Sequence, residues 1–281
     1  MLRVAIPNKG SLSEPAAAML REAGYRQRTD SRDLVLIDPD NQIEFYYLRP
    51  KDIAVYVGEG TLDVGITGRD LLLDSGSPAE ELLPLGFAGS TFRLAARPGT
   101  ASRVEDLEGL RVATSYAGLM KKFLAEHGVN AQVTRLDGAV ETAIKLGVAD
   151  VIADVVETGA TLRQAGLELF GDPILRSEAV LIKRDGVADP GELEQLVRRL
   201  QGVIVARDYV LMDYDIEADR IEDAVQVTPG LEGPTVSPLH RAGWVAVRVM
   251  VPRVDAQRLM DELWELGARA ILVTSIHACR L

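Results

Sequence analysis

The chain is poor in the residues that build disulfides, thiol chemistry and histidine-based catalysis. Its 281 residues include one cysteine, Cys279, and three histidines. A single cysteine excludes an internal disulfide and a cysteine metal cluster. His127, His240 and His277 are scattered, and none lies in a loop that carries other candidate site residues. A Ser-His-Asp or Cys-His mechanism is therefore not expected.

Positive charge and long apolar runs are also scarce. Lys and Arg number 31 against 42 Asp and Glu, a net charge of 31 − 42 = −11, which opposes non-specific nucleic-acid binding. No apolar run approaches the ~20 residues of a membrane span, and the opening MLRVAIPNKG enters a strand and a turn rather than a secretory signal. We expect a cytoplasmic protein with neither nucleic acid nor membrane as partner. An anionic substrate would need a local cluster of Lys and Arg.

The alternation of apolar strands with helices predicts an α/β protein of more than one domain. Two similar lobes joined by paired crossings are expected, an arrangement that resembles periplasmic binding proteins, with the ligand cleft between the lobes. The predicted lobe I comprises residues 1–96 and 179–208, and lobe II comprises residues 97–178, with a crossing at Arg97-Pro98-Gly99. Residues 209–281 follow a β-α-β-β-α-β order, which predicts a ferredoxin-like domain.

Four basic residues directly follow predicted strands of lobe I. They are Lys9 (beside Gly10), Arg49, Lys51 and Arg69. Open α/β sheets bind ligands at the carboxyl ends of their strands. We therefore predict that these cations converge on one anion pocket, although each alone would be an ordinary solvated surface residue.

A loop after the strand Val151–Val156 carries the groups expected of a sugar-phosphate site. Asp154 stands near the end of this apolar strand, where a carboxylate is costly without a partner. Thr158, Gly159 and Thr161 follow, and free N–H groups at a helix start bind phosphate. A carboxylate accepts two hydrogen bonds side by side, as from a ribose diol. The loop alone is equally typical of an ordinary strand–turn–helix junction.

Taken together, the motifs resemble the signature of ATP phosphoribosyltransferase, the first enzyme of histidine biosynthesis. In that family a Glu precedes a spaced Gly, a small residue, a branched apolar residue, an Asp and a Ser/Thr-Gly-x-Thr-Leu loop. The resemblance covers essentially the whole chain. The signature positions are Glu141, Gly147, Ala149, Ile152, Asp154, Thr158, Gly159, Thr161 and Leu162, with further matches at Asn8-Lys9-Gly10, Leu48-Arg49-Pro50-Lys51-Asp52 and Gly65-Ile66-Thr67-Gly68-Arg69-Asp70.

The resemblance implies transfer of phosphoribose from 5-phosphoribosyl 1-pyrophosphate to N1 of the adenine ring of ATP, with release of pyrophosphate. Such a step requires a neutralised leaving group and an aimed purine nitrogen while positive charge grows at the anomeric carbon. Positioning and electrostatics meet these needs without a nucleophilic side chain. The implied cofactor is Mg2+, which arrives with the phosphates rather than in a protein cage.

The resemblance also assigns roles residue by residue. The 5-phosphate loop is Thr158, Gly159, Ala160 and Thr161, and the diol carboxylate is Asp154. The basic residues that face the pyrophosphate are Lys9, next to Gly10, and Lys51, with Arg49 beside them. The positions near the nucleotide are Asp70 and Tyr116, and the further cleft residues are Asp137 and Glu141. Glu157 departs from the family, where a small residue can stand, so its carboxylate must point away from the phosphate.

The C-terminal module resembles that of the long form of the family, which works without a separate regulatory subunit. This form is feedback-inhibited by L-histidine, is also inhibited by AMP, and assembles from dimers into hexamers. The resemblance places the histidine site around Asp215, Leu231, Thr235 and Ala270. For Leu231 and Ala270 a plain core position is an equally good interpretation.

Two other classes of function remain open at this level. A two-lobed solute-binding protein would share the cleft, although the phosphate-type loop argues against it. A ligand-sensing regulator would share the tail module and would bind histidine without turnover.

Overall fold

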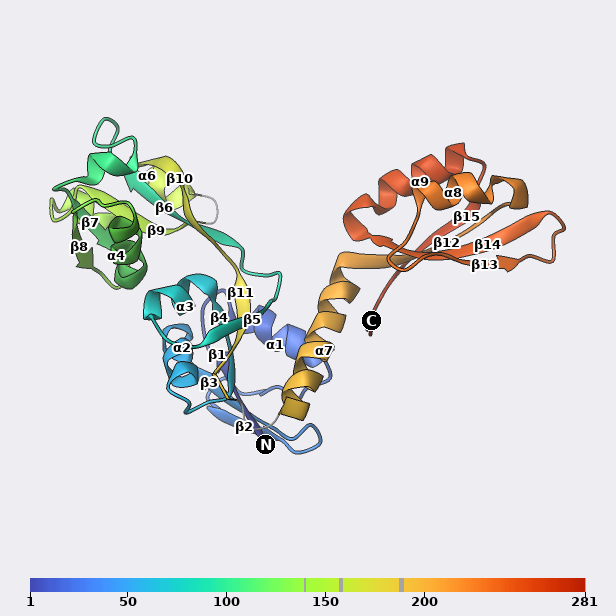
Figure 1. Ribbon diagram of the computed structural model, residues 1–281, viewed down its shortest axis with the longest axis horizontal. Helices are drawn as coiled ribbons and strands as arrows, with labels where there is room; N and C mark the ends of the chain where they lie inside the picture. Colours follow the sequence, from blue (N-terminus) through green and yellow to red (C-terminus); the bar gives the residue numbers. More distant parts are fainter. Residues whose placement is uncertain (139, 157–158, 187–189, 281) are drawn as a thin grey trace. The chain divides into compact units, whose positions relative to one another are not determined.

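The computed structural model describes residues 1–138, 140–156, 159–186 and 190–280. The chain forms two compact units. The first comprises Met1–Arg21 with Tyr25–Glu194, and the second comprises Glu22–Gly24 with Gln195–Leu281. Figure 1 shows two lobes within the first unit, each built on its own sheet.

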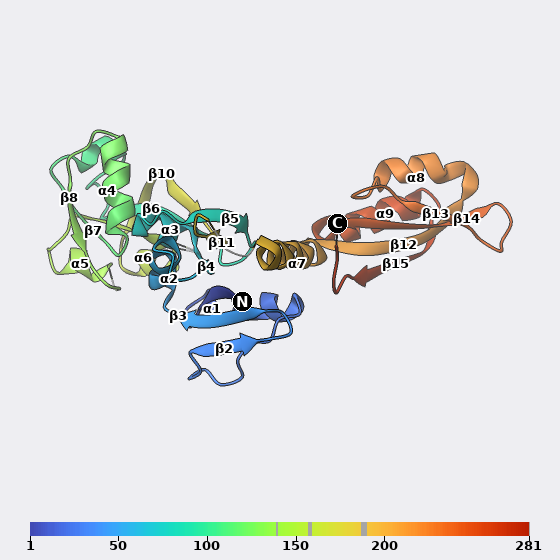
Figure 2. The ribbon, with the colours of Figure 1, turned by 60° about the horizontal axis from the view of Figure 1, so that its bottom comes forward.

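Lobe I is built on a six-stranded mixed sheet of order β2-β3-β1-β4-β11-β5. β1 lies parallel to β3 and β4, whereas β2, β11 and β5 join antiparallel. Figure 2 shows the antiparallel β2–β3 hairpin. The strands are β1 (Leu2–Pro7), β2 (Val35–Asp38), β3 (Ile43–Leu48), β4 (Val64–Gly68), β5 (Glu80–Pro84) and β11 (Ala179–Lys183); the helices are α1 (Ser13–Glu22), α2 (Pro50–Gly58) and α3 (Arg69–Ser75).

Apolar side chains of α2 and α3 cover one face of this sheet. Ile53, Val57 and Leu72 pack there against Ala5 and other buried strand residues. Gly65 in β4 allows close contact, because a Cβ there would lie 2.5 Å from Ile53. This packing fixes the carboxyl ends of β1, β3 and β4, where the predicted site residues begin.

Lobe II is built on a five-stranded sheet of order β10-β6-β9-β7-β8. One face is covered by α4, with Leu119 and Met120 buried against Phe92, and the other by α5 and α6, with Ile144 and Leu162 buried. The strands are β6 (Ser90–Ala96), β7 (Arg111–Thr114), β8 (Gln132–Arg135), β9 (Val151–Val156) and β10 (Glu168–Ser177); the helices are η1 (Val104–Leu107), α4 (Ala117–Glu126), α5 (Thr142–Lys145) and α6 (Ala160–Gln164).

The crossing between the lobes lies earlier in the chain than predicted. β6 pairs with β9 and β10 in the lobe II sheet, so the first crossing falls at residues 85–89 rather than at Arg97-Pro98-Gly99. Pro-Gly indicates a turn but does not say which sheet the preceding strand joins. The return crossing is Glu178, between β10 and β11.

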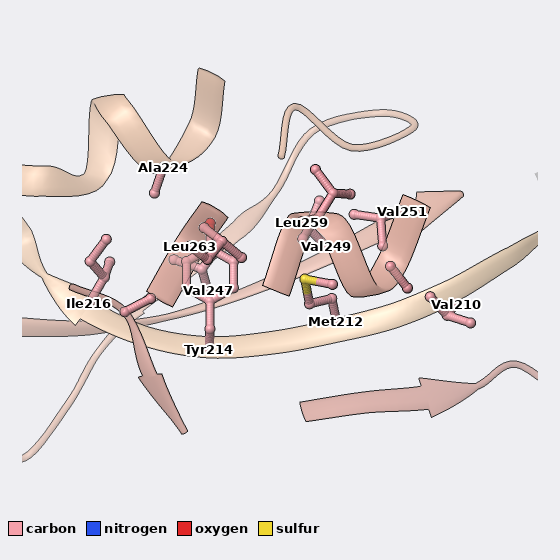
Figure 3. Close-up of a cluster of buried hydrophobic side chains, with 12 residues drawn as sticks. Val210, Met212, Tyr214, Ile216, Ala224, Val247, Val249, Val251, Leu259 and Leu263 are labelled. Carbon is pink, nitrogen blue, oxygen red and sulfur yellow. The ribbon is translucent and has the colours of Figure 1, made fainter. Parts of the chain in front are cut away.

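The second unit contains the predicted ferredoxin-like domain. Its four strands have the antiparallel order β13-β14-β12-β15, and its elements follow the β-α-β-β-α-β sequence. Figure 3 shows the buried side chains of β12 and β14 pointing toward α8 and α9. The elements are α7 (Pro190–Asp208), β12 (Tyr209–Glu217), η2 (Ala218–Arg220), α8 (Ile221–Val227), β13 (Thr235–Pro238), β14 (Trp244–Pro252), η3 (Arg253–Asp255), α9 (Ala256–Glu265) and β15 (Arg269–Ser275).

Both tryptophans of the chain belong to this second unit, and each is stacked under an arginine. The guanidinium of Arg241 lies 4.0 Å from the ring of Trp244, and that of Arg269 lies 4.2 Å from Trp264. The unit also takes most of α7, from Gln195, whereas the sequence assigned residues up to 208 to lobe I.

A buried carboxylate ties β1 to β11 in lobe I. Asp63 accepts hydrogen bonds from the Arg3 amide at 2.9 Å and from two nitrogens of Arg184 at 3.0 and 3.1 Å. Burial raises the pKa of this carboxyl, but the Arg3 amide and the Arg184 guanidinium lower it by more, so the net pKa is below its ordinary value.

We expect Asp63→Asn to destabilise the first unit by about 1–3 kcal/mol, because it leaves the half-buried Arg184 guanidinium beside a neutral amide. The wild-type carboxyl has a depressed folded pKa, so its contribution is present above the unfolded pKa of about 4. That contribution is lost as the pH falls through the folded value. Urea denaturation followed by far-UV circular dichroism at pH 7 and pH 3 measures both effects. The exposed Asp33→Asn is the control and should change little; equal losses for both variants would contradict the role of Asp63.

Candidate active site

A cavity of about 590 Å³ lies between the two lobes of the first unit. Residues of both lobes line it, because the strand-end loops of lobe I meet the loops after β7 and β8 of lobe II. The lining is Lys9, Gly10, Ser11, Leu12, Arg49, Pro50, Lys51, Asp52, Gly68, Asp70, Leu71, Ala88, Ser90, Tyr116, Asp137, Val155, Ser177 and Glu178.

Three of the four predicted cations line this cavity, each from a different position at the strand ends. Lys9 follows β1, Arg49 follows β3, and Lys51 stands in the first turn of α2. Arg69 is the exception: its guanidinium binds Glu81 at 2.7 and 2.8 Å and Glu178 at 3.4 Å. The inclusion of Arg69 in the anion pocket was therefore wrong, since two carboxylates neutralise it at the lobe crossing.

Lys51 reaches across the cavity to lobe II. Its Nζ lies 3.1 Å from Oδ1 of Asp137, in the loop after β8. The hydrogen bond and charge of Lys51 lower the pKa of Asp137. Both side chains are substantially exposed, so the pair exchanges readily with a charged ligand.

Asp70 is nearly buried at the start of α3 and has a serine from the return crossing as its partner. Ser177 Oγ donates to Asp70 Oδ1 at 2.8 Å and accepts from the Asp70 amide at 3.0 Å. Burial, followed by the charge of Asp70 and a hydrogen bond to it, raises the pKa of Tyr116. The Tyr116 hydroxyl therefore stays protonated and serves as a donor at neutral pH.

A second cavity, of about 300 Å³, lies beside the predicted phosphate loop. Gly159 adopts φ +70° at the start of α6, a conformation that favours glycine. The lining is Glu141, Asp154, Val155, Val156, Gly159, Ala160, Thr161 and Leu162. Thr158, assigned to the 5-phosphate, and Glu157, the departure from the family pattern, lie outside the described residues.

The predicted site residues are thus distributed over two neighbouring cavities. Lys9 lines the larger one and Thr161 the smaller one, and Val155 borders both. Asp137 faces the larger cavity, whereas Glu141, expected in the same cleft, faces the smaller. A ligand that spans the lysines and the threonine loop must pass the backbone at Val155.

Asp154, in the smaller cavity, has a pKa above the ordinary value of an aspartate. Burial raises its pKa, the Val155 amide at 2.8 Å lowers it, and the charges of Glu141 and Asp70 raise it further. The charge of Lys51, from the larger cavity, opposes that rise. The two cavities are therefore electrostatically coupled through Asp154.

Sequence reasoning missed several residues of the larger cavity. Ser177, at the end of β10, and Glu178 line it at the return crossing; Ala88 and Ser90, the first residue of β6, line it at the first crossing. Ala88 has φ +53°, an uncommon conformation for a residue with a side chain. No motif marks these positions; the signal was the pair of crossings, whose ends must border the cleft between the lobes.

The residues predicted to bind the inhibitor L-histidine do not share one cavity in the second unit. Asp215 is half-buried on β12 opposite Arg269, the neighbour of Ala270, and Thr235 pairs with Arg248 on β14. Ala270 has φ +50° beside a register shift between β12 and β15. Leu231 lines a separate cavity of about 290 Å³ between the loop after α8 and the start of α9.

Within the described ranges, no group of three or more His, Cys, Asp or Glu side chains is arranged to hold a metal ion. Likewise, no helix among the described residues is long and apolar enough to cross a membrane.

The arrangement predicts that Glu141→Gln lowers the pKa of Asp154, because it removes a repelling charge. Lys51→Met should raise that pKa, because it removes an attracting charge. Carboxyl 13C NMR titration of the protein without substrates measures both shifts. Glu126→Gln, an exposed change on α4, is the control; identical titrations in all variants would contradict the coupling.

Comparison with known proteins places the whole chain. The family model for ATP phosphoribosyltransferase matches residues 49–202, and the model for the HisG C-terminal domain matches residues 206–278. The ATP phosphoribosyltransferase of Paenarthrobacter aurescens is 69% identical and that of Streptomyces avermitilis is 65% identical, each over 100% of both chains.

A solved structure agrees with these sequence matches. The ATP phosphoribosyl transferase (HisG:HisZ) complex from Thermotoga maritima is 27% identical, with a TM-score of 0.62, over 73% of this chain and 98% of that chain. Sequence identity of 65–69% to transferases over the full chain length excludes both the solute-binding and the purely sensory interpretation. The chain belongs to the ATP phosphoribosyltransferase family, in its long form, and is a pentosyltransferase of histidine biosynthesis.

Proposed function

We propose that the two adjoining cavities together hold the substrates of phosphoribosyl transfer from 5-phosphoribosyl 1-pyrophosphate to N1 of ATP. The observation that carries this assignment is the meeting of three lobe I cations with the Gly159–Thr161 loop of lobe II, at cavities that share Val155. Two polyanions need positive charge and free amides, and this cleft supplies both in a chain of net charge −11.

The donor's ribose 5-phosphate is assigned to the smaller cavity. Gly159, Ala160 and Thr161 open α6, where backbone amides and a hydroxyl bind the phosphate, and Thr158 is kept in this role by resemblance. Asp154 accepts the two ribose hydroxyls. Its raised pKa means that the carboxylate is poorly solvated, so hydroxyl donors are favourable partners there.

The leaving pyrophosphate is assigned to the larger cavity, with Lys9, Lys51 and Arg49 around it. Lys51 is paired with Asp137 across the lobes, so pyrophosphate binding exchanges one anionic partner for another. As the C–O bond breaks, negative charge grows on the pyrophosphate and these cations stabilise it. Asp154 and Glu141, on the ribose side, stabilise the positive charge that grows at the anomeric carbon.

The nucleotide is assigned to the walls formed by Asp70 and Tyr116. Both line the larger cavity, where the Tyr116 hydroxyl is hydrogen-bonded to Asp70. Attack by N1 needs no side-chain nucleophile, because the adenine supplies the electron pair and pyrophosphate leaves with the bonding pair. Orientation alone can account for about 7–11 kcal/mol of the barrier.

The divalent metal that such transferases usually require is assigned as Mg2+ bound to the substrate phosphates. Magnesium keeps several waters and takes few protein ligands, so the substrate phosphates are its natural ligands here. When bound, it neutralises phosphate charge.

We further assign L-histidine inhibition to the ferredoxin-like domain, and AMP inhibition to the nucleotide walls of the cleft. Asp215 on β12 and Ala270 on the adjacent β15 offer a carboxylate and a strained backbone. Thr235 lies on β13, at the opposite edge of the sheet, and Leu231 lines a separate cavity, so these two are kept in the assignment by resemblance. A homo-oligomer from dimer to hexamer in the cytoplasm completes the proposal.

Asp154→Asn should reduce kcat/KM for 5-phosphoribosyl 1-pyrophosphate about 10- to 100-fold, because it removes charged hydrogen bonds to the diol. In the wild type, KM for this donor should rise as the pH falls through the raised pKa of Asp154, since the protonated carboxyl is the weaker acceptor. Formation of N1-alkylated adenine, followed by absorbance with ATP and Mg2+, measures both. Glu126→Gln is the matched control; wild-type kinetics in Asp154→Asn would refute the diol role.

Asp215→Asn should raise the histidine concentration for half-inhibition about tenfold, because a charged hydrogen bond to the ligand is lost, while uninhibited turnover stays at the wild-type level. Inhibition curves and calorimetry with histidine give the two measurements. Asp219→Asn, an exposed carboxylate in the same unit, should behave as wild type. Undiminished histidine binding in Asp215→Asn would locate the sensor elsewhere.

A further inference from the structure

Helix α4 of lobe II receives its N-terminal cap from lobe I. Within the described chain, Tyr116 at the N-cap position makes no side-chain capping bond, and the first turn of α4 carries no acidic residue. The amides of Gly118 and Leu119 instead donate to Oδ1 of Asp74, at 2.8 and 3.0 Å. Asp74 belongs to α3, so the contact joins the two lobes directly.

A glycine provides the room for this contact. A Cβ on Gly118 would lie 2.3 Å from the carbonyl oxygen of Asp74 and 3.2 Å from its Oδ1. Gly118 is not among the residues with positive φ, so its backbone conformation is open to any residue. Its small size therefore serves the close approach of α3 to α4.

The capping contact lies next to the two groups assigned to the nucleotide, Asp70 and Tyr116, which are hydrogen-bonded to each other. Asp70 stands four residues before Asp74, on the same face of α3, and Tyr116 is the residue from which α4 starts. The charge of Asp74 is also among the causes that raise the pKa of Tyr116. The Tyr116 ring is held on its other side by Phe92, at 5.5 Å between ring centres.

We propose that Asp74 is a positioning residue: by capping α4 from the opposite lobe, it fixes the spacing between Asp70 and Tyr116. The assignment of that spacing to the adenine nucleotide rests on the proposed function. A carboxylate at this helix end also excludes a substrate phosphate from the amides of Gly118 and Leu119. Those amides are thus kept as a structural joint rather than as an anion site.

The kinetic test compares Asp74→Ala, Asp74→Asn and Gly118→Ala. Asp74→Ala should raise KM for ATP about five- to tenfold, the size of effect known for lost helix caps, with kcat changed less than twofold. Asp74→Asn should recover most of the loss, because its Oδ1 still accepts both amides. Gly118→Ala should match Asp74→Ala, and the double variant should be no worse than either, since both break one joint.

The physical test needs no turnover. Hydrogen exchange at the Gly118 and Leu119 amides, measured without substrates, should accelerate in Asp74→Ala and Gly118→Ala and stay slow in Asp74→Asn. Glu126→Gln, at the far end of α4, is the control and should exchange as the wild type. Far-UV circular dichroism identifies any variant that fails to fold. The exchange rates of the variants that do fold then test the capping role of Asp74.

The outcomes separate this proposal from the proposed function. Unchanged exchange in Asp74→Ala would overturn the cap, and faster exchange with unchanged KM for ATP would overturn the positioning role. If the wild-type protein transferred no phosphoribose, the proposed function would fail instead. In that case calorimetry would measure the affinity for ATP in place of KM. The positioning role then requires weaker ATP binding in Asp74→Ala and Gly118→Ala than in Asp74→Asn.

Discussion

An acidic protein that binds two polyanions must concentrate its positive charge in one place, and this constraint organises the first unit. The parallel strands β1, β3 and β4 end together, so Lys9, Arg49 and Lys51 reach one cavity although they are far apart in the chain. The fourth predicted cation, Arg69, has other partners: it is bound by Glu81 and Glu178 at the lobe crossing. The net charge of −11 is therefore compatible with anion binding, because local geometry outweighs the average.

The carboxylates of the cleft are as informative as its cations. Burial raises the pKa of Asp154, and the charges of Glu141 and Asp70 raise it further. Such an arrangement is unfavourable for the empty protein and becomes favourable when positive charge or hydroxyl donors arrive. Perturbed carboxyl groups of this kind gather at functional sites more often than elsewhere.

Local sequence features predicted much of the fold but left the partners of some strands undetermined. Strand β9 and the ferredoxin-like order follow from short-range patterns and are confirmed. The pairing of β6 with lobe II is a long-range choice that no local pattern encodes, and β5 and β10 are too polar to read as buried strands.

The candidate site divides in the same way. Motif residues such as Lys51 and Asp154 could be named from the sequence, because the chemistry needs those residue types. Ser177, Glu178 and Asp74 could not, since their importance lies in contacts between segments more than 40 residues apart, such as Asp74 with Gly118.

Both tryptophans lie in the second unit, so the tryptophan fluorescence of the protein comes from that unit alone. Trp244 and Trp264 are each stacked on an arginine within that unit, while the cleft of the first unit is lined by tyrosine. Light absorbed selectively by indole therefore reports on the C-terminal domain, and events in the cleft reach that signal only if they alter this domain. Emission recorded while the cleft is being filled would thus act as a direct gauge of communication between the two units.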